Sequence, residues 1–505
     1  MQSEGRIRSN SKLIHCIFAV TLAIVGLRYS LAQRPDPTSA SAAALVKSGR
    51  YDAAISEAKR ALMVSPKDPG LWTIEGIAYA MQGKDHEALA ALRTALHIEP
   101  GFVRALQAEA QILSRRHDLE LTGVLEKILR LDPNDSTARE LLALEQARRD
   151  DCKSADQNFR QLSTQLSTHA ESLERYGTCL FTEGEYTQSA VIFGQFRTLQ
   201  PESADAGYDL ALAEARAGEK KEAAETLKPL LASPDVETAL LASDVFEDLG
   251  DTPQAVSLTH RAIVLDPMLP EPYLRFAELC MLHESYEPGI DMVSAGISRM
   301  PQNSGLYLAR GLLYGALAQY DKAEADFRMA EQFDPSHGIG AYGVGLVQVQ
   351  SNHSAEALAT IRPALKDHPQ DPQLNFLFAR ILIEDGAAPG SPEFRDAARA
   401  AERAVQLKPD LLPAHNLLAK IDDMRGDTAA VIQQCREALR LDPTDQSALF
   451  RLMRAVSKTG DTRTAQALMR QVAEQHEHAR AEESERLRYK IVEATGPEPQ
   501  PPTKP

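Results

Sequence analysis

The sequence contains one glycine spacing and one histidine pair that could bind a ligand. Gly338, Gly340 and Gly343 are spaced G-x-G-x-x-G, which cradles the phosphates of a dinucleotide when a strand precedes it and a helix follows. No strand pattern precedes these glycines, so nucleotide binding is disfavoured. His476 and His478 lie two residues apart in a predicted helix, which points them to different faces and disfavours a shared metal ion.

The other histidines do not form a catalytic set. They lie in turns and at the starts of predicted helices: His283, His337, His353, His368 and His415. No serine, cysteine or carboxylate recurs beside them at a spacing that would suggest a triad. We therefore expect a protein that is not an enzyme and has no cofactor.

Composition and charge restrict the partners. The 505 residues include 55 Lys and Arg against 71 Asp and Glu, a formal net charge of −16 at pH 7. This charge disfavours non-specific binding to nucleic acid or to anionic lipid. Only 6% of the residues are aromatic, and Trp occurs once, which suits thin helical layers better than one large core.

Residues 70–100 show the local unit from which the chain is built. Large and small apolar residues share one helical face, a glycine follows, and a second helical face ends at a proline: Trp72, Gly76, Tyr79, Gly83, Ala88, Leu92, Ala95 and Pro100. The glycine supplies a left-handed turn, and the proline cannot continue the second helix. The stretch therefore predicts a helix, a turn and a helix.

This unit recurs along the chain. Closing prolines follow at steps of 33 or 34 residues, apart from one double step and one of 40: Pro66, Pro100, Pro133, Pro201, Pro234, Pro267, Pro301, Pro335, Pro369, Pro409 and Pro443. The pattern resembles the tetratricopeptide repeat, whose period is about 34 residues. The resemblance covers residues 37–473 in about thirteen units. It implies an all-α fold, a right-handed superhelix of antiparallel helix pairs.

Small residues recur where the two helices of a unit must approach each other. The eighth and twentieth places of the units are Gly, Ala or Ser, with the exceptions Glu109, Leu121, Val431 and Met453. A larger side chain at these places would push the helix axes apart.

Two places depart from the period. The turn within Arg115–Leu121 lacks its glycine, and six extra residues fall within the loop Gly386–Phe394. Such a surface loop is either inert or a point of contact. If the chain were an enzyme after all, its catalytic centre would be expected at one of these two places.

Membership of this repeat family would place a binding groove along the first helices. The fifth and ninth residues of each first helix usually line that groove, and in the last three units they are Phe376 with Arg380, Asn416 with Lys420, and Phe450 with Arg454. Three basic residues beside two aromatic rings and an amide suit an acidic segment or a terminal carboxylate. Alternatively, the basic side chains are only solvated. The Lys and Asn pattern of chaperone-binding tetratricopeptide domains is absent.

The middle of the array carries the opposite charge. Asp244, Glu247, Asp248, Glu278 and Glu284 fall on or near the same predicted wall. One interpretation is a single concave surface that is acidic in the middle of the array and basic at its C-terminal end. The other is that these carboxylates are ordinary surface residues of an acidic protein.

Residues 1–32 resemble a secretory signal peptide. Basic residues precede the apolar run Leu13–Leu27, and Ser30 and Ala32 are small residues at the positions that a signal peptidase reads. A helix of this run reaches about 22 Å, short of a hydrocarbon core of about 30 Å, so a retained membrane anchor is the weaker alternative. Residues 33–36 are expected to form a linker.

The end of the chain is predicted to close the array. Residues 474–494 are charged on most faces and read as a capping helix, because an uncapped array would expose apolar surface. Residues 495–505 are rich in proline and read as a disordered tail.

Four cysteines follow the predicted signal segment. Cys152 opens the second helix of one unit and Cys179 lies in the first helix of the next, so this pair can form a disulfide in an exported protein. The alternative is four buried thiols, Cys280 and Cys435 included.

These features together predict a non-enzymatic scaffold that binds protein or peptide partners in the groove of a repeat superhelix. The resemblance to exported bacterial proteins implies a periplasmic or secreted scaffold of the cell envelope. The alternative is an accessory subunit of an envelope assembly, polysaccharide-export or secretion complex, anchored to the inner membrane by an uncleaved N-terminal segment. The sequence does not identify the partner.

Overall fold

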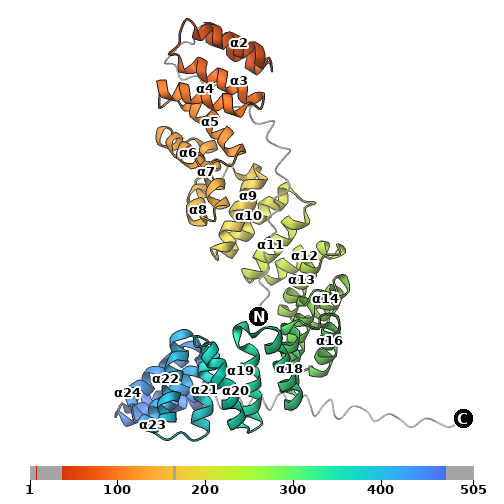
Figure 1. Cartoon of the computed structure of the whole chain (residues 1–505), viewed down its shortest axis with the longest axis vertical. Helices are drawn as coiled ribbons and strands as arrows, with labels where there is room; N and C mark the ends of the chain where they lie inside the picture. Colours follow the sequence, from red (N-terminus) through yellow and green to blue (C-terminus); the bar gives the residue numbers. More distant parts are fainter. Residues whose placement is uncertain (1–6, 8–36, 163–165, 474–505) are drawn as a thin grey trace, which may run out of the picture. The chain divides into compact units, whose positions relative to one another are not determined.

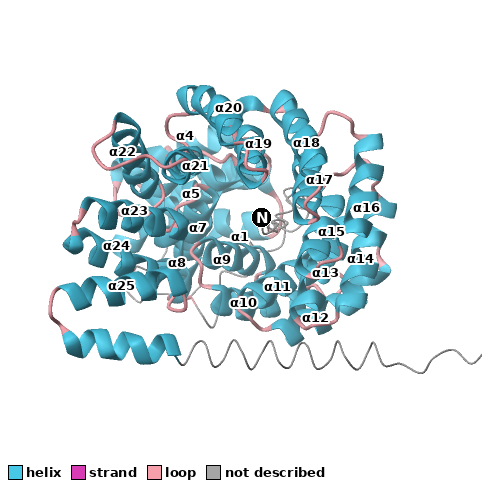
Figure 2. Cartoon of the chain, turned by 90° about the horizontal axis from the view of Figure 1, so that it is seen from below, coloured by secondary structure: helices cyan, strands magenta, loops and turns pink. Residues whose placement is uncertain are grey.

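The protein is helical throughout the residues that its structure describes. The computed structural model describes residue 7 and residues 37–162 and 166–473. Within these residues there is no strand, and short loops join consecutive helices (Figure 2). The all-α fold class is therefore confirmed. The predicted signal cleavage site, capping helix and tail lie outside the described residues.

The described helices divide into two compact units, which meet in sequence at Leu265 and Asp266 and which we call unit 1 and unit 2 (Figure 1). Unit 1 contains α1 (Pro37–Lys47), α2 (Tyr51–Leu62), α3 (Pro69–Met81), α4 (Asp85–Ile98), α5 (Val103–Arg115), α6 (Leu121–Leu131), α7 (Ser136–Arg148), α8 (Cys152–Arg160), α9 (Ala170–Thr182), α10 (Tyr186–Leu199), α11 (Ala204–Arg216), α12 (Lys220–Leu227), α13 (Val236–Asp248) and α14 (Thr252–Leu265).

Unit 2 contains α15 (Glu271–Leu282), α16 (Tyr286–Arg299), α17 (Ser304–Ala316), α18 (Tyr320–Phe333), α19 (Ile339–Gln350), α20 (Ser354–Asp367), α21 (Pro372–Glu384), α22 (Pro392–Leu407), α23 (Leu412–Arg425), α24 (Thr428–Leu441) and α25 (Gln446–Lys458). A further helix begins at residue 462 and completes the pair that α25 starts. Odd-numbered helices are thus the first helices of their repeats, and even-numbered helices are the second.

In six repeats a polar side chain caps the first helix soon after the closing proline. The cap lies two residues after the proline in six repeats, and its oxygen accepts a hydrogen bond from a backbone N–H of the first helical turn: Asp68, Asp135, Ser203, Asn303, Asp371 and Asp445. Such a cap stabilises a helix by about 1 kcal/mol. In these six repeats the proline and the cap therefore set where the first helix begins.

A second recurring hydrogen bond joins the first helix of a repeat to the end of the preceding repeat. The fourth residue of the repeat donates from its side chain to the carbonyl oxygen of the closing proline six residues earlier. Six residues do this in the described chain: Trp72, Arg139, Tyr273, Tyr307, Asn375 and His415. Their types differ, but each has a polar N–H or O–H group at the end of its side chain, which satisfies a carbonyl that the ended helix leaves unpaired.

The small residues at the eighth place are required by close helix packing. A Cβ atom added to Gly177 would lie 2.7 Å from the Phe193 ring, and one added to Gly311 would lie 2.7 Å from the Phe327 ring. Both aromatic rings belong to the second helix of the same repeat. The glycine and the ring therefore fill one shared volume between the two helices.

The turn within each pair adopts a left-handed conformation whether or not glycine is present. Gly83, Gly184 and Gly426 have φ values of 73°, 81° and 81°. In the five repeats without this glycine, a residue of the turn has positive φ as well: His117, Asp150, Glu284, Ala318 and Asn352. The pair geometry therefore imposes this dihedral, and a residue with a Cβ atom is strained by it.

The Ala318→Gly substitution is expected to stabilise unit 2. Ala318 has a φ of 54°, and removing its Cβ should relieve strain by more than the added chain entropy costs, a net gain of about 0.5–1 kcal/mol. The matched control is Ala316→Gly at the exposed end of α17, which should destabilise by up to about 1 kcal/mol. Thermal unfolding of both variants measures the difference, and equal shifts would contradict the prediction.

The two departures from the period are local changes in the turns. His117 adopts the left-handed conformation after α5, and α6 begins only at Leu121. In the insertion, Gly386 and Gly390 both have a φ of 90°, and α22 starts at Pro392. The inserted stretch ends in Phe394, which is buried in the core of unit 2.

Candidate binding surface

Within each unit, the first helices lie on the inner side of the stack and the second helices on the outer side. Figure 2 shows α9, α11 and α13 inside α10, α12 and α14 in unit 1, and α17 and α19 inside α18 and α20 in unit 2. The side chains that can meet a partner on the inner side therefore come from the first helices.

The first of the three predicted residue pairs is mostly enclosed by its own unit. Phe376 on α21 is only 9% exposed and packs in the core of unit 2, so its ring is not an open stacking surface. The Arg380 Nε atom donates a hydrogen bond to Glu384 Oε1 at 2.8 Å. Arg380 is therefore partly neutralised by Glu384. The Arg380 charge also acts on Tyr342: burial raises the pKa of Tyr342, and Arg380 offsets part of that rise.

The other two pairs are more open. Lys420 on α23 is half-buried, Arg454 on α25 is exposed, and neither forms an ion pair among the described residues. Phe450, one turn before Arg454, is 53% exposed. Asn416 donates to Asp445 Oδ2 at 3.0 Å, and its own buried Oδ1 has no hydrogen-bond partner in the described structure. At these predicted groove positions, two cations thus have no ion pair among the described residues, one ring is exposed, and one amide oxygen is buried.

The same place holds further positive charge. The Lys458 Nζ atom lies 2.9 Å from Asp423 Oδ1, and this hydrogen bond lowers the pKa of Asp423, with Arg454 and Arg451 adding to the effect. One carboxylate therefore lies among several cations. We call Lys420, Phe450 and Arg454 the basic surface, and its charge suits an anionic group.

Of the five acidic residues predicted for the middle of the array, the three in unit 1 lie on α13. Asp248 pairs with Lys220, with 3.5 Å between Nζ and Oδ1, whereas Asp244 and Glu247 are half-buried. In unit 2, Glu278 lies 3.4 Å from Arg275. Glu284 occupies the left-handed turn after α15 instead of the inner wall.

Sequence reasoning missed an apolar patch on the inner side of unit 1. The unit 1 patch consists of Leu144, Ala147, Phe181 and Ala215, which are half-buried and pack against the hydrophobic cores of the unit. Three of them occupy the twelfth place of successive repeats, which is a signal that the sequence does contain. The predicted groove positions, the fifth and ninth places, do not include the twelfth place.

The G-x-G-x-x-G spacing is explained by helix packing. A Cβ atom on Gly340 would lie 2.6 Å from the backbone nitrogen of Glu331, and one on Gly343 would lie 2.6 Å from the Phe327 ring. The N-terminus of α19, where a phosphate would bind, is already occupied by the Glu331 carboxylate, which accepts a hydrogen bond from the Ala341 N–H at 3.0 Å. These glycines let α18 and α19 approach each other.

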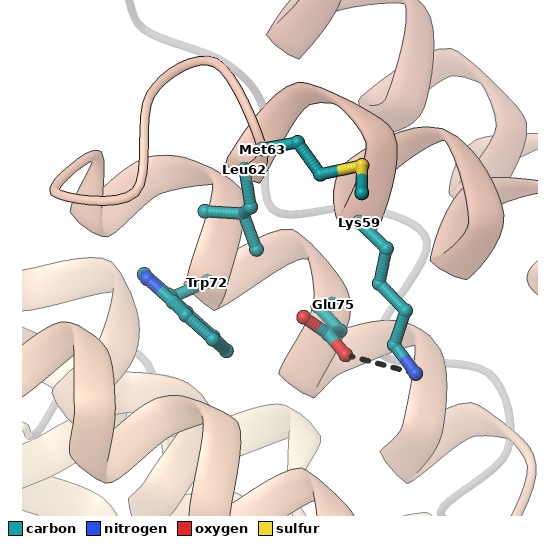
Figure 3. Close-up of a pocket in the computed structure, with 5 residues that line it drawn as sticks. All are labelled: Lys59, Leu62, Met63, Trp72 and Glu75. Carbon is teal, nitrogen blue, oxygen red and sulfur yellow. Dashed lines mark ion pairs between the residues drawn. The ribbon is translucent and has the colours of Figure 1, made fainter.

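An open hollow of about 450 Å³ lies between α2 and α3 (Figure 3). It is lined by Lys59, Leu62, Met63, Trp72 and Glu75, and the Lys59 Nζ atom lies 3.7 Å from Glu75 Oε1. Burial raises the pKa of Glu75. No serine, cysteine or histidine is among the residues that line it, so the hollow does not suggest hydrolytic chemistry.

The four cysteines that follow the predicted signal segment form one disulfide and two free thiols. Cys152 and Cys179 are joined by a disulfide in the structure, with their Cα atoms 4.9 Å apart. Cys280 and Cys435 are buried free thiols, and burial raises the pKa of each to about 11. The two free thiols are therefore poor nucleophiles. Whether the disulfide forms in the cell stays a prediction.

The described residues form neither a metal-binding cluster nor a membrane-spanning helix. No three of their His, Cys, Asp and Glu side chains are grouped so that they could hold a metal ion. No helix among them is both long and apolar enough to cross a membrane.

Repeated helix pairs, with capped starts, glycine contacts and a charged inner side, define the chain as an α-helical repeat solenoid. Profiles of the tetratricopeptide repeat match residues 40–101, 180–237 and 304–337. The chain is a tetratricopeptide repeat protein.

Similarity to known proteins is low or partial. Over 143 residues, or 28% of this chain, it is 29% identical to cellulose synthase operon protein C of Pseudomonas fluorescens (strain SBW25), and it spans 11% of that protein. Yeast Tom70 is similar over 89% of this chain and 95% of its own, at 16% identity and a TM-score of 0.41. YrrB, described as a tetratricopeptide protein with an unusual peptide-binding site, is similar over 38% of this chain and 96% of its own, at 18% identity and a TM-score of 0.28.

Proposed function

We propose that this protein is a non-enzymatic scaffold of the bacterial cell envelope, which binds an acidic segment or a terminal carboxylate of a partner protein on its inner side. The observation that supports this most directly is the basic surface. Lys420 and Arg454 occupy predicted groove positions of α23 and α25 and form no ion pair in the described structure, and the ring of Phe450, one turn before Arg454, is exposed. A carboxylate could take up both charges, and the ring could pack against the adjoining apolar atoms.

The envelope location rests on the N-terminal pattern and on one relative. Residues 1–32 have the order of charge, apolar run and small residues of a signal peptide. The relative's name assigns that protein to a cellulose synthase operon, which supports a role for this chain near envelope polysaccharide synthesis. The alternative, an anchored accessory subunit of an envelope complex, would retain the same apolar run.

The basic surface can be tested by charge reversal. The full chain with Arg380→Glu, Lys420→Glu and Arg454→Glu is compared with the unchanged chain in cross-linking of whole cells, followed by identification of the captured proteins. We expect capture of the main partner to fall by about tenfold or more, because attraction becomes repulsion at three places. Undiminished capture would rule out this surface as the partner site.

A matched control separates local from general charge effects. The exposed residues Arg399, Arg436 and Arg440 lie on second helices of the same unit, and their change to Glu alters the net charge by the same amount. We expect this control to bind the partner as the unchanged chain does. Equal losses in both triple variants would indicate a general charge effect and contradict the proposed surface.

Fractionation distinguishes an exported scaffold from an anchored subunit. A soluble periplasmic product that starts at Gln33 supports the exported form. Membrane retention with an intact N-terminus supports the anchored alternative.

A further inference from the structure

The hollow between α2 and α3 contains a buried carboxylate that is incompletely paired. Glu75 is only 4% exposed, and its Oε2 atom has no hydrogen-bond partner among the described residues. Its one ion pair in the described structure is with Lys59, at 3.7 Å between Nζ and Oε1. The Lys59 ammonium group donates a shorter hydrogen bond, of 2.8 Å, to the Tyr79 hydroxyl oxygen. Glu75 therefore carries a buried charge that its surroundings compensate only in part.

Other repeats have an apolar or aromatic residue at the place of Glu75. Glu75 is the seventh residue of its repeat, and from α7 onward the seventh residues other than Arg310 are Leu142, Tyr176, Leu210, Ala242, Phe276, Val344, Phe378, Leu418 and Leu452. A carboxylate at such a place costs stability unless a cation pairs with it. Helix packing alone therefore does not explain Glu75.

The chain pairs four other buried carboxylates with arginine. The pairs are Glu109 with Arg93 at 3.0 Å, Glu145 with Arg149 at 2.7 Å, Asp326 with Arg310 at 2.7 Å, and Asp422 with Arg425 at 3.4 Å. Arginine suits such places because its planar guanidinium is more weakly hydrated than an ammonium group and donates from several N–H groups. No arginine of the described chain pairs with Glu75. The cation that its surroundings lack is therefore best supplied by an arginine.

One of these pairs shows how an arginine fits into a repeat. Arg310 donates to both oxygens of Asp326 at 2.7 Å, and its guanidinium carbon lies 5.8 Å from the centre of the Tyr307 ring. Tyr307 is the fourth residue of that repeat, and Trp72 is the fourth residue of the repeat that contains Glu75. The hollow thus has a carboxylate and a fourth-place ring, but no guanidinium of the described chain joins them.

The shape of the hollow suits an arginine side chain. Figure 3 shows Glu75 between Trp72 and Lys59, with one carboxylate oxygen toward Lys59 and the other toward the side of Trp72. The Trp72 ring is held in place because its Nε1 atom donates to the carbonyl oxygen of the preceding closing proline at 3.0 Å. This ring can stack on a guanidinium, and Leu62 and Met63 offer apolar contacts to the methylene stem. Met63 is 87% exposed, so the hollow can be entered from solvent.

We propose that the hollow between α2 and α3 is a binding site for an arginine side chain of a partner protein. The guanidinium donates to Glu75 Oε2 and stacks on Trp72, and the stem packs against Leu62 and Met63. Binding pairs a carboxylate that is otherwise buried at a cost, and this favours an arginine over a neutral side chain. The site is independent of the basic surface, which lies in unit 2 and attracts the opposite charge.

Trp72 makes the site directly measurable because it is the only tryptophan of the chain. The tryptophan fluorescence of the full chain is followed during titration with N-acetylarginine methylamide and, at equal ionic strength, with the citrulline and lysine analogues. We expect a saturable change with the arginine compound and at least about tenfold weaker binding of the neutral citrulline compound. Lysine should bind about threefold more weakly than arginine, since it lacks the planar group.

This comparison needs no variant, so it stays decisive even if a substitution prevents folding. No saturable change with the arginine compound, or equal affinities for arginine and citrulline, would overturn the proposal. Tighter binding of lysine than of arginine would contradict the assignment of arginine.

Substitution of Glu75 tests the carboxylate. Glu75→Gln keeps the size of the side chain and should weaken binding of the arginine compound about tenfold. Glu75→Leu introduces the type of residue found at the seventh place of other repeats, so it should remain folded and lose the binding. The matched control Glu87→Gln removes the same charge at an exposed position of α4 and should bind as the unchanged chain does. Undiminished binding by Glu75→Gln, or equal losses in Glu75→Gln and Glu87→Gln, would count against the site.

A second measurement does not depend on fluorescence. In a chain with isotope-labelled tryptophan, the indole N–H of Trp72 gives one magnetic resonance signal, and its shift should follow the same binding curve. A fluorescence change without this shift would mean quenching in solution and would overturn the proposal. Partner capture by the basic surface is measured on variants of unit 2, so failure of either proposal can be recognised without the other.

Discussion

The Gly340→Ala substitution is expected to destabilise unit 2 by about 3 kcal/mol. The added Cβ atom would lie 2.6 Å from the backbone nitrogen of Glu331 and 2.7 Å from the carbonyl oxygen of Phe327. Both atoms belong to the backbone of α18, so no side-chain rotation can relieve the overlap. Only a shift of α18 relative to α19 can do so, and this would loosen the packing of Phe327.

The matched control for this prediction is Gly315→Ala. Gly315 is also a helical glycine of unit 2, but a Cβ atom there would meet nothing within 4 Å. Alanine favours the helix, so this variant should be neutral or more stable by up to about 1 kcal/mol. Opposite signs for the two variants would show that packing, and not helix propensity, decides the effect of an added Cβ atom at Gly340.

Hydrogen exchange is the appropriate measurement because a repeat array need not unfold in a single step. Protection should fall most in α18 and α19 and much less in the helices of unit 1. If Gly340→Ala and Gly315→Ala gave the same protection, the interpretation of the G-x-G-x-x-G spacing as a packing contact would be wrong.

The helix pairs could be predicted because each rests on rules that act within one repeat. A glycine at the turn, a small residue opposite a large one and a proline at the end all lie within about 34 residues of each other. Gly83 and Gly311 therefore have the roles that the sequence indicates. Sequence reasoning did not find the hydrogen bond to the closing proline, because six chemically different residues share it.

The binding surfaces depend on contacts between repeats, and sequence phase resolves these only in part. The fifth place is exposed at Phe450 but buried at Phe376, because the latter packs into the large core around α21 and α22. The ninth place is neutralised at Arg380 by Glu384, one helical turn away on the same helix.

Removal of the Cys152–Cys179 disulfide is the second change with a large expected effect. The bond closes a loop with a sequence separation of 27 residues, and a loop of this length restricts the unfolded chain by about 3–4 kcal/mol in the chain-entropy description. The bond also joins the start of α8 to the last turn of α9, and so links two successive repeats. Its loss should therefore let unit 1 open between these two repeats.

A comparison of single and double variants tests the bond without relying on one substitution. If the thiols are joined, Cys152→Ala alone should cost nearly as much stability as Cys152→Ala with Cys179→Ala, since either change breaks the same bond. Reductant should speed hydrogen exchange in α8 and α9 of the unchanged chain but not in the double variant. The Cys280→Ala variant keeps the bond and should respond to reductant as the unchanged chain does. Additive losses without a reductant effect would instead mean that Cys152 and Cys179 are two separate buried thiols, and the bond would then give no reason to expect an oxidising compartment.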